Sequence, residues 1–217
     1  MSKGCIYCSG PLFCPEERAG MSQVARIFEE SGYATFLPHR DGIERFVLGS
    51  ANNPAANLPG VSKLTRAINR AIFCLDIYQI VEVCDALVFN MNGRVPDEGG
   101  VVETAVAWTA GKPLIIYKND ARSKVGGNDN SMITGLSPEF ATVGELETLP
   151  REIEKAREKI RTASPNLHRG ENLPPQVRTA LERGRRIWAV LQNLPTPRNS
   201  KETIELLEQL TLETREG

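Results

Sequence analysis

Short apolar runs alternate with longer stretches of helical periodicity from residue 5 to about residue 145. The short runs carry few polar side chains, which is typical of strands buried on both faces of a parallel sheet. In the longer stretches apolar residues share one helical face, as Met21, Val24 and Phe28 do. This alternation predicts an α/β fold whose parallel sheet has about five strands, with helices on both faces. The predicted strands are 5–8, 34–37, 86–91 and 113–117, and the predicted helices between them are 15–32, 62–83 and 100–110.

Polar or glycine-rich segments follow the predicted strands. In parallel sheets ligands bind beyond the carboxyl ends of the strands, where these segments lie. The 39–62 stretch is rich in Pro, Gly and Asn and is predicted to be a long loop. A binding site is therefore expected among the strand-end segments 9–13, 39–42, 90–100 and 118–130.

The pattern after residue 145 is helical without strands. We therefore predict two domains: an α/β domain over 1–147 and a C-terminal helical extension over 148–217. The extension is expected to dock on the α/β core or on a second subunit, and to carry no chemistry. Its predicted elements are a charged helix at 150–162, a linker at 164–175 and helices at 175–194 and 200–212.

Composition narrows the possible partners. The 217 residues include 26 basic and 27 acidic side chains, so no global field attracts nucleic acid or an anionic membrane. The N-terminus lacks a long apolar segment, and no stretch reaches the roughly 18 apolar residues that a membrane span needs. We expect a cytoplasmic protein that binds neither nucleic acid nor membrane.

Five cysteines without an export signal argue against a framework of disulfides. Cys5 and Cys8 form a Cys-x-x-Cys pair, which indicates either metal or redox chemistry or small residues around a buried strand. A second Cys or His pair at zinc-finger spacing is missing from the sequence, so a metal is not expected.

The most informative residue is Glu103. The predicted helix 100–110 is otherwise apolar and small, so it is expected to be buried with Glu103 as its only charge. A buried carboxylate costs free energy unless something compensates it, and its predicted place in the first turn favours an anion. Acidic residues in first turns are also common without any chemistry. Asp97 and Glu98 lie just before the helix, so three carboxyl groups converge; a purely structural alternative for Asp97 is an N-cap.

Converging carboxyl groups suit the cleavage of a glycosidic bond. A carboxylate stabilises or traps the oxocarbenium-like state while another acid protonates the leaving group. Motifs of the common alternatives are missing from the sequence: it has no phosphate-binding P-loop, no dinucleotide-binding Gly-x-Gly-x-x-Gly after the first strand and no Gly-x-Ser-x-Gly elbow.

Four segments in this order resemble the nucleoside 2-deoxyribosyltransferase family: 6–13, 37–41, 84–90 and 97–105. Together the likeness spans roughly residues 4–145. The resemblance implies a doubly wound, flavodoxin-like sheet, a small nucleoside and nucleobase as substrates, no cofactor, and a homo-oligomer. It further implies that sugar is transferred between bases, a reaction of nucleotide salvage.

The resemblance also implies roles for individual residues. Glu103 attacks the anomeric carbon, and Asp97, six residues earlier, binds the sugar hydroxyls. Asp76 contacts the base and exchanges protons with it. Tyr7 lines the pocket near Glu103, although an ordinary core aromatic explains it equally from sequence.

Further residues at the strand ends complete the predicted binding site. Asn130 and Met132 resemble a segment that reaches the sugar 5′ position of a neighbouring subunit, whereas the alternative for Asn130 is a turn residue. His39 and Asp41 either bind the base or a phosphate, or begin a solvated loop. The remaining predicted binding residues are Gly10, Pro11, Phe13, Asn90 and Gly99.

Alternatives to deoxyribosyl transfer remain open at this point. The first is hydrolysis of a nucleoside or nucleoside 5′-monophosphate, and the second is a non-catalytic nucleotide sensor. Ser9 precedes Gly-Pro rather than a basic residue, which favours a nucleoside over a nucleotide. Some 60 residues follow the core, so Gly217 is not expected to place its carboxylate in a neighbour's site, and the long 39–62 loop is expected to influence substrate choice.

Overall fold

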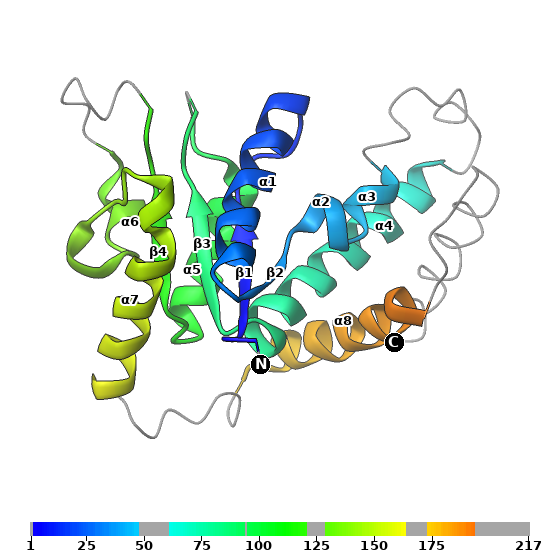
Figure 1. The fold of residues 1–217 in the computed structure, drawn as a ribbon. Coiled ribbons are helices and arrows are strands. Elements are labelled where there is room, and N and C mark those ends of the chain that lie inside the picture. The colour runs from blue at the N-terminus through cyan, green and yellow to red at the C-terminus, as the bar shows by residue number, and fades with distance from the viewer. Residues whose placement is uncertain (1, 48–60, 94, 121–128, 164–172, 194–217) are drawn as a thin grey trace. The chain divides into compact units, whose positions relative to one another are not determined.

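A computed structural model describes residues 2–47, 61–93, 95–120, 129–163 and 173–193 (Figure 1). The chain divides into two compact units that are discontinuous in sequence. The sheet unit comprises Met1–Leu37 and Ile80–Glu171, and the helical unit comprises Pro38–Gln79 and Asn172–Gly217. A division of the chain at residue 147 stays a prediction.

The sheet unit is built on four parallel strands in the order β2-β1-β3-β4. Val143 adds a single parallel bridge to Tyr117 beside β4, where a fifth strand of such a sheet would lie. The strand order and the flanking helices confirm the predicted doubly wound, flavodoxin-like α/β fold. The strands are β1 (Cys5–Ser9), β2 (Ala34–Phe36), β3 (Ala86–Asn90) and β4 (Leu114–Tyr117).

Alternate residues of β1 face opposite sides of the sheet. Ile6 and Cys8 join a core with α1 (Pro15–Glu30) and α7 (Leu149–Ala163), whereas Tyr7 and Ser9 face α5 (Glu98–Thr109) (Figure 1). Helices thus cover both faces of the sheet as predicted, α1 and α7 on one face and α5 on the other. The core on the first side comprises Ile6, Cys8, Met21, Val24, Ala25, Phe28, Tyr33, Leu37, Ala86, Val88, Ile115, Leu149, Ile153 and Ala156.

Helix α7 belongs to this core, although the sequence assigned it to the C-terminal extension. Leu149, Ile153 and Ala156 are buried at helical spacing against the sheet. The opposite face of α7 is charged, and a strongly charged helical sequence of this kind is also typical of an appendage.

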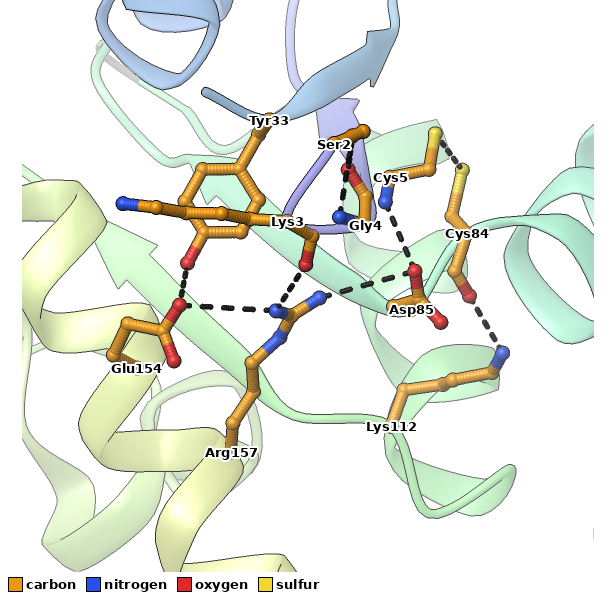
Figure 2. Close-up of polar contacts among 10 residues, drawn as sticks. All are labelled: Ser2, Lys3, Gly4, Cys5, Tyr33, Cys84, Asp85, Lys112, Glu154 and Arg157. Atoms are coloured by element: carbon orange, nitrogen blue, oxygen red, sulfur yellow. Dashed lines mark hydrogen bonds and ion pairs between the residues drawn. The ribbon is translucent and has the colours of Figure 1, made fainter. Parts of the chain in front are cut away.

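Polar contacts tie α7 to the amino ends of β1 and β3 (Figure 2). Arg157 donates from Nη1 to the Lys3 carbonyl oxygen at 2.9 Å, and its Nη2 lies 3.9 Å from Asp85 Oδ2. Tyr33 donates to Glu154, one turn before Arg157. Burial, followed by this hydrogen bond, raises the pKa of Tyr33 to about 12, so the phenol stays protonated near neutral pH.

The helical unit contains α2 (Pro38–Asp41), α3 (Glu44–Val47), α4 (Val61–Tyr78) and α8 (Pro175–Asn193). Helix α8 packs on α4 through Gly184, whose missing side chain lets the helix approach Cys74 and Tyr78 closely. Helix α4 leads directly into a π-helical segment, η3 (Gln79–Val83), and together they cover the helix predicted at 62–83.

The prediction of a long loop at 39–62 is wrong for residues 39–47, because α2 and α3 each form one helical turn there. Its positions 48–60 lie outside the described residues, as do most of the predicted linker and the helix predicted at 200–212. Short elements complete the sheet unit after β4: α6 (Ser131–Thr134), η5 (Pro138–Phe140) and η6 (Leu146–Thr148). In the part of the chain that is described, every helix is too short or too polar to cross a membrane.

Candidate active site

Glu103 on α5 lies against the carboxyl-terminal half of β1. Its Oε1 accepts a hydrogen bond from the Tyr7 hydroxyl at 2.9 Å, and its Oε2 accepts one from Ser9 Oγ at 2.6 Å. Tyr7 and Ser9 are fully buried, and Glu103 is partly buried. The two donors lie two residues apart on one strand, so both face α5. Each carboxylate oxygen therefore has its own hydroxyl donor.

The environment of Glu103 changes its proton affinity. Burial raises the pKa of Glu103, the hydrogen bonds from Ser9 and Tyr7 lower it, and the negative charge of Asp97 raises it; the net direction is upward. Among the described residues, no cationic side chain is paired with this carboxylate. A carboxylate with a raised pKa and no counter-ion is a better nucleophile than an ordinary surface glutamate.

The start of α5 differs from the prediction. Asp97 is the N-cap, and its Oδ2 accepts a hydrogen bond from Gly100 N at 2.7 Å, so the helix begins at Glu98, two residues early. Glu103 consequently lies in the second turn rather than the first, beyond the reach of the unpaired amides. Hydroxyl groups from β1 replace those amides as its partners.

The expectation of a fully buried α5 is also wrong. Val102 and Trp108 are each 57% exposed on its outer face, while Thr104 and Ala107 are fully buried. The helix is apolar around its whole circumference, so its sequence alone does not distinguish the two faces.

Gly100 allows α5 to approach the sheet. A Cβ at this position would lie 2.5 Å from the ring of Phe89 and 3.1 Å from Ser9 Oγ. A side chain there would push the helix away from β1 and β3, and Glu103 would move away from its two donors. Gly100 thus allows Glu103 to lie within hydrogen-bonding distance of Tyr7 and Ser9.

Gly10 and Asn90 shape the adjacent strand ends. Gly10 has a φ of 151°, and a Cβ there would meet Met21 Sδ at 2.7 Å. Asn90 is buried, and its Oδ1 accepts hydrogen bonds from the backbone N and side-chain Nδ2 of Asn92. These residues end β1 and β3, between which the strand order reverses direction, and ligands of open α/β sheets bind at that point.

Other predicted binding residues also lie in the sheet unit. Pro11 is partly buried, Phe13 is 74% exposed beside the start of α1, and Gly99 is exposed in the first turn of α5. Asn130 caps α6 by accepting a hydrogen bond from Met132 N at 2.9 Å, and Met132 is 80% exposed. The alternative interpretation of Asn130 as a turn residue therefore describes its local structure, and the binding roles stay predictions.

The segment that carries Asn130 is fixed to the end of β4. Lys118, which directly follows β4, is buried and forms an ion pair with Asp129, next to Asn130. This pair anchors the start of α6 at the carboxyl edge of the sheet, the edge at which Glu103 meets Ser9.

Three predicted residues belong to the helical unit. Asp76 is partly buried on α4, and His39 and Asp41 lie on α2. The carboxylate of Asp41 pairs with Arg40 at 2.9 Å. The substrate-binding and proton-transfer roles of these residues stay predictions.

The sequence does not predict Ser9 as a partner of Glu103. It predicts Ser9 as the first residue of the loop 9–13, where it bears only on the choice between a nucleoside and a nucleotide. The structure extends β1 to Ser9. The alternation of a strand would have placed Ser9 on the same face as Tyr7, and this is the sequence signal that was available.

Cys5 and Cys8 have different surroundings. Cys8 faces the α1 core, whereas Cys5 Sγ lies 3.3 Å from Cys84 Sγ at the amino end of the sheet (Figure 2). Within the described ranges, no group of three or more His, Cys, Asp or Glu side chains is placed to hold a metal ion.

Comparisons with known proteins fit this geometry. A family model described as nucleoside 2-deoxyribosyltransferase matches residues 6–139, which is more than half of the 217 residues. The matched region includes Tyr7, Ser9, Asp97 and Glu103. A comparison with curated proteins gives no match.

Proposed function

The chain belongs to the nucleoside 2-deoxyribosyltransferase family, and on that premise we propose that it transfers 2-deoxyribose between nucleobases through Glu103. The family consists of enzymes of glycosyl transfer. The observation that carries the proposal is the Glu103 carboxylate, held by Tyr7 and Ser9 at the carboxyl edge of the sheet without a counter-ion among the described residues.

In the first half-reaction, an oxygen of Glu103 attacks the anomeric carbon of the sugar. The bond between that carbon and the base nitrogen breaks, its electron pair leaves with the base, and an ester joins the sugar to Glu103. The departing base takes up a proton, which we assign to Asp76 because the resemblance gives this residue the contact with the base.

In the second half-reaction, a nitrogen of the incoming base attacks the same carbon. The ester bond breaks, its electron pair returns to Glu103, and the proton on the attacking nitrogen passes to Asp76. Retaining glycosidases divide their reaction in the same way, with a carboxylate nucleophile and a covalent intermediate.

Asp97 holds the sugar in this proposal. Its Oδ2 already accepts the hydrogen bond from Gly100 N, so we assign Oδ1 to the sugar hydroxyl. One residue would then fix both the start of the helix that carries Glu103 and the substrate. Such coupling keeps the nucleophile and the anomeric carbon in register.

An exchange assay tests this function. The protein is incubated with each of four 2′-deoxynucleosides, and with the matching 5′-monophosphates, in the presence or absence of a different free base. Formation of a new deoxynucleoside supports transfer. Free deoxyribose without exchange points to a hydrolase of the same fold. If none of these compounds reacts, the result contradicts an enzymatic role.

The design includes a variant that separates chemistry from folding. Glu103→Gln keeps the size of the side chain but removes its nucleophilic charge. We expect this variant to fold and to bind substrate without exchanging bases. Cytoplasmic location, assembly into a homo-oligomer and a place in nucleotide salvage stay predictions from the sequence.

A further inference from the structure

We propose that Ser9 is a positioning residue that makes Glu103 a better leaving group in the second half-reaction. The inference rests on the proposed function and adds to it a residue that controls how long the covalent intermediate persists. It starts from the short hydrogen bond, 2.6 Å, from Ser9 Oγ to Glu103 Oε2.

Ser9 is enclosed on all sides. Its exposed fraction is 0%, and a Cβ on Gly100 would come within 3.1 Å of its Oγ. Substrate and water therefore do not reach this hydroxyl directly. Ser9 acts on the reaction through Glu103 alone.

The single hydroxyl proton of Ser9 has two acceptors within range. One is Glu103 Oε2 at 2.6 Å, and the other is the Gly100 carbonyl oxygen at 3.4 Å. Hydrogen bonds to an ionised acceptor are shorter and roughly twice as strong as those between neutral groups. The proton is therefore held most strongly by Glu103 when Glu103 is a free carboxylate, and less strongly when Glu103 is a neutral ester.

This difference acts in opposite directions on the two half-reactions. A donor to the free carboxylate makes Glu103 less basic and so a weaker nucleophile when the ester forms. The same donor stabilises the carboxylate that departs when the ester breaks. Loss of Ser9 should slow breakdown of the intermediate more than its formation, and the intermediate should accumulate.

The direction of the pKa effect agrees with this geometry. The hydrogen bond from Ser9 is the larger of the two hydroxyl contributions that lower the pKa of Glu103. Without it the pKa of Glu103 rises further, so the acidic limb of the activity profile should move to higher pH.

A matched control is available on α5. Thr104 is fully buried and donates from Oγ1 to the Gly100 carbonyl oxygen at 2.6 Å, the second acceptor within reach of Ser9. Thr104→Val removes a buried hydroxyl that donates to this same Gly100 carbonyl oxygen. It leaves Glu103 and its two donors in place. Like Ser9→Ala, it should lower the stability of the protein by removing one buried hydroxyl, but it keeps both hydrogen-bond donors to Glu103.

The experiment measures the fraction of enzyme that carries deoxyribose on Glu103 during steady turnover, by rapid quenching and mass spectrometry. The variants are Ser9→Ala, Ser9→Cys and Thr104→Val, and each profile of activity against pH is recorded. For Ser9→Ala we expect an increase on the order of tenfold in the ratio of adduct to free enzyme, together with a shifted acidic limb. Ser9→Cys keeps a weak donor and should lie between Ser9→Ala and the native protein.

The outcomes separate this inference from the proposed function. Thr104→Val should match the native protein in both readouts, even if its melting temperature falls. Native values for Ser9→Ala, or equal changes in Ser9→Ala and Thr104→Val, would overturn the role of Ser9 while the function stands. If the native protein exchanges no bases and forms no adduct, the proposed function itself is wrong. Should Ser9→Ala fail to fold, Ser9→Cys carries the same comparison.

Discussion

The two edges of the parallel sheet hold their carboxylates in different ways. At the amino edge, the side chains of Asp85 and Glu154 are 43% and 52% exposed and both lie near the guanidinium of Arg157 (Figure 2). At the carboxyl edge, Glu103 is more enclosed, and its described partners are the hydroxyls of Tyr7 and Ser9.

The partners of these carboxylates suit two different tasks: holding the fold together at the amino edge and reacting with substrate at the carboxyl edge. At the amino edge, the guanidinium of Arg157 lies within 4 Å of both carboxylates and joins α7 to the strands. A cation at Glu103 would also stabilise its charge, but it would weaken the carboxylate as a nucleophile. Hydroxyl donors orient the oxygens without a full opposite charge, and burial then raises the pKa of Glu103.

The largest predicted effect removes the nucleophile. Glu103→Gln should lower the rate of base exchange on the order of 10⁶-fold, since loss of a residue that forms the covalent intermediate costs about that much in a well-studied hydrolase. Its control is Glu154→Gln at the amino edge, which should exchange bases at the native rate. Exchange assays on both variants check the comparison, and near-native exchange by Glu103→Gln would contradict it.

A second prediction concerns how closely α5 approaches the sheet. Gly100→Ala should lower the free energy of unfolding by about 1–3 kcal/mol, because the new methyl group meets the ring of Phe89. It should also slow exchange, because Glu103 moves away from its donors.

Gly20 on α1 offers the matched control, since a Cβ there meets nothing within 4 Å. Gly20→Ala should stabilise the protein by roughly 0.4–1 kcal/mol. Urea denaturation compares the two variants. Equal stability of Gly100→Ala and Gly20→Ala would show that Gly100 does not set the position of the helix.

A third prediction follows from the raised pKa of Glu103. A carboxyl group whose pKa is higher in the folded state favours folding at low pH, and this contribution is lost as the pH rises through the folded pKa. Glu103→Gln removes the charge that burial disfavours, so it should increase the free energy of unfolding at pH 7.

That gain should shrink as the pH falls toward the ordinary glutamate value of 4.5. Urea denaturation of the native protein and of Glu103→Gln between pH 4 and pH 8 measures it. Glu154→Gln serves again as the control and should bring no gain. A Glu103→Gln variant that is less stable than the native protein at pH 7 would contradict the prediction.

The smallest predicted effect lies at the amino edge. Arg157→Met should lower the free energy of unfolding by about 0.5–1 kcal/mol, because it removes the hydrogen bond to Lys3 and the contact with Asp85. Arg161→Met, which breaks an exposed pair with Glu158 on the same helix, should cost less.

Both arginine variants should keep native exchange rates at temperatures where they are folded. Thermal denaturation and exchange assays measure the two properties side by side. A large loss of exchange in folded Arg157→Met would show that the two edges of the sheet are not independent.

Strand alternation and helical periodicity predict the fold well, whereas the place of Tyr7 beside Glu103 follows only from the resemblance to the family. Buried parallel strands leave a strong apolar signal, and the strand-end segments follow from it. The sequence predicts the start of α5 two residues late, because the two glycines after Glu98 have weak helix propensity, while the N-cap at Asp97 is strong enough to begin the helix there.

Two other features depend on contacts between distant segments. Helix α7 has a charged surface but buries Leu149 and Ile153 against the sheet, and that burial depends on where the strands place their apolar face. Ser9 became a partner of Glu103 because β1 extends to it and Gly100 lets α5 approach. The sequence lists these residues without indicating that they meet.

The most direct test of Glu103 as the nucleophile is the detection of its covalent intermediate. The protein is mixed with a 2′-deoxynucleoside without an acceptor base, quenched in acid, digested and analysed by mass spectrometry. We predict that the peptide containing Glu103 carries the added mass of one deoxyribosyl group, and that Glu103→Gln lacks it. Base exchange by the native protein with no such adduct, or with the adduct on another residue, would contradict this account.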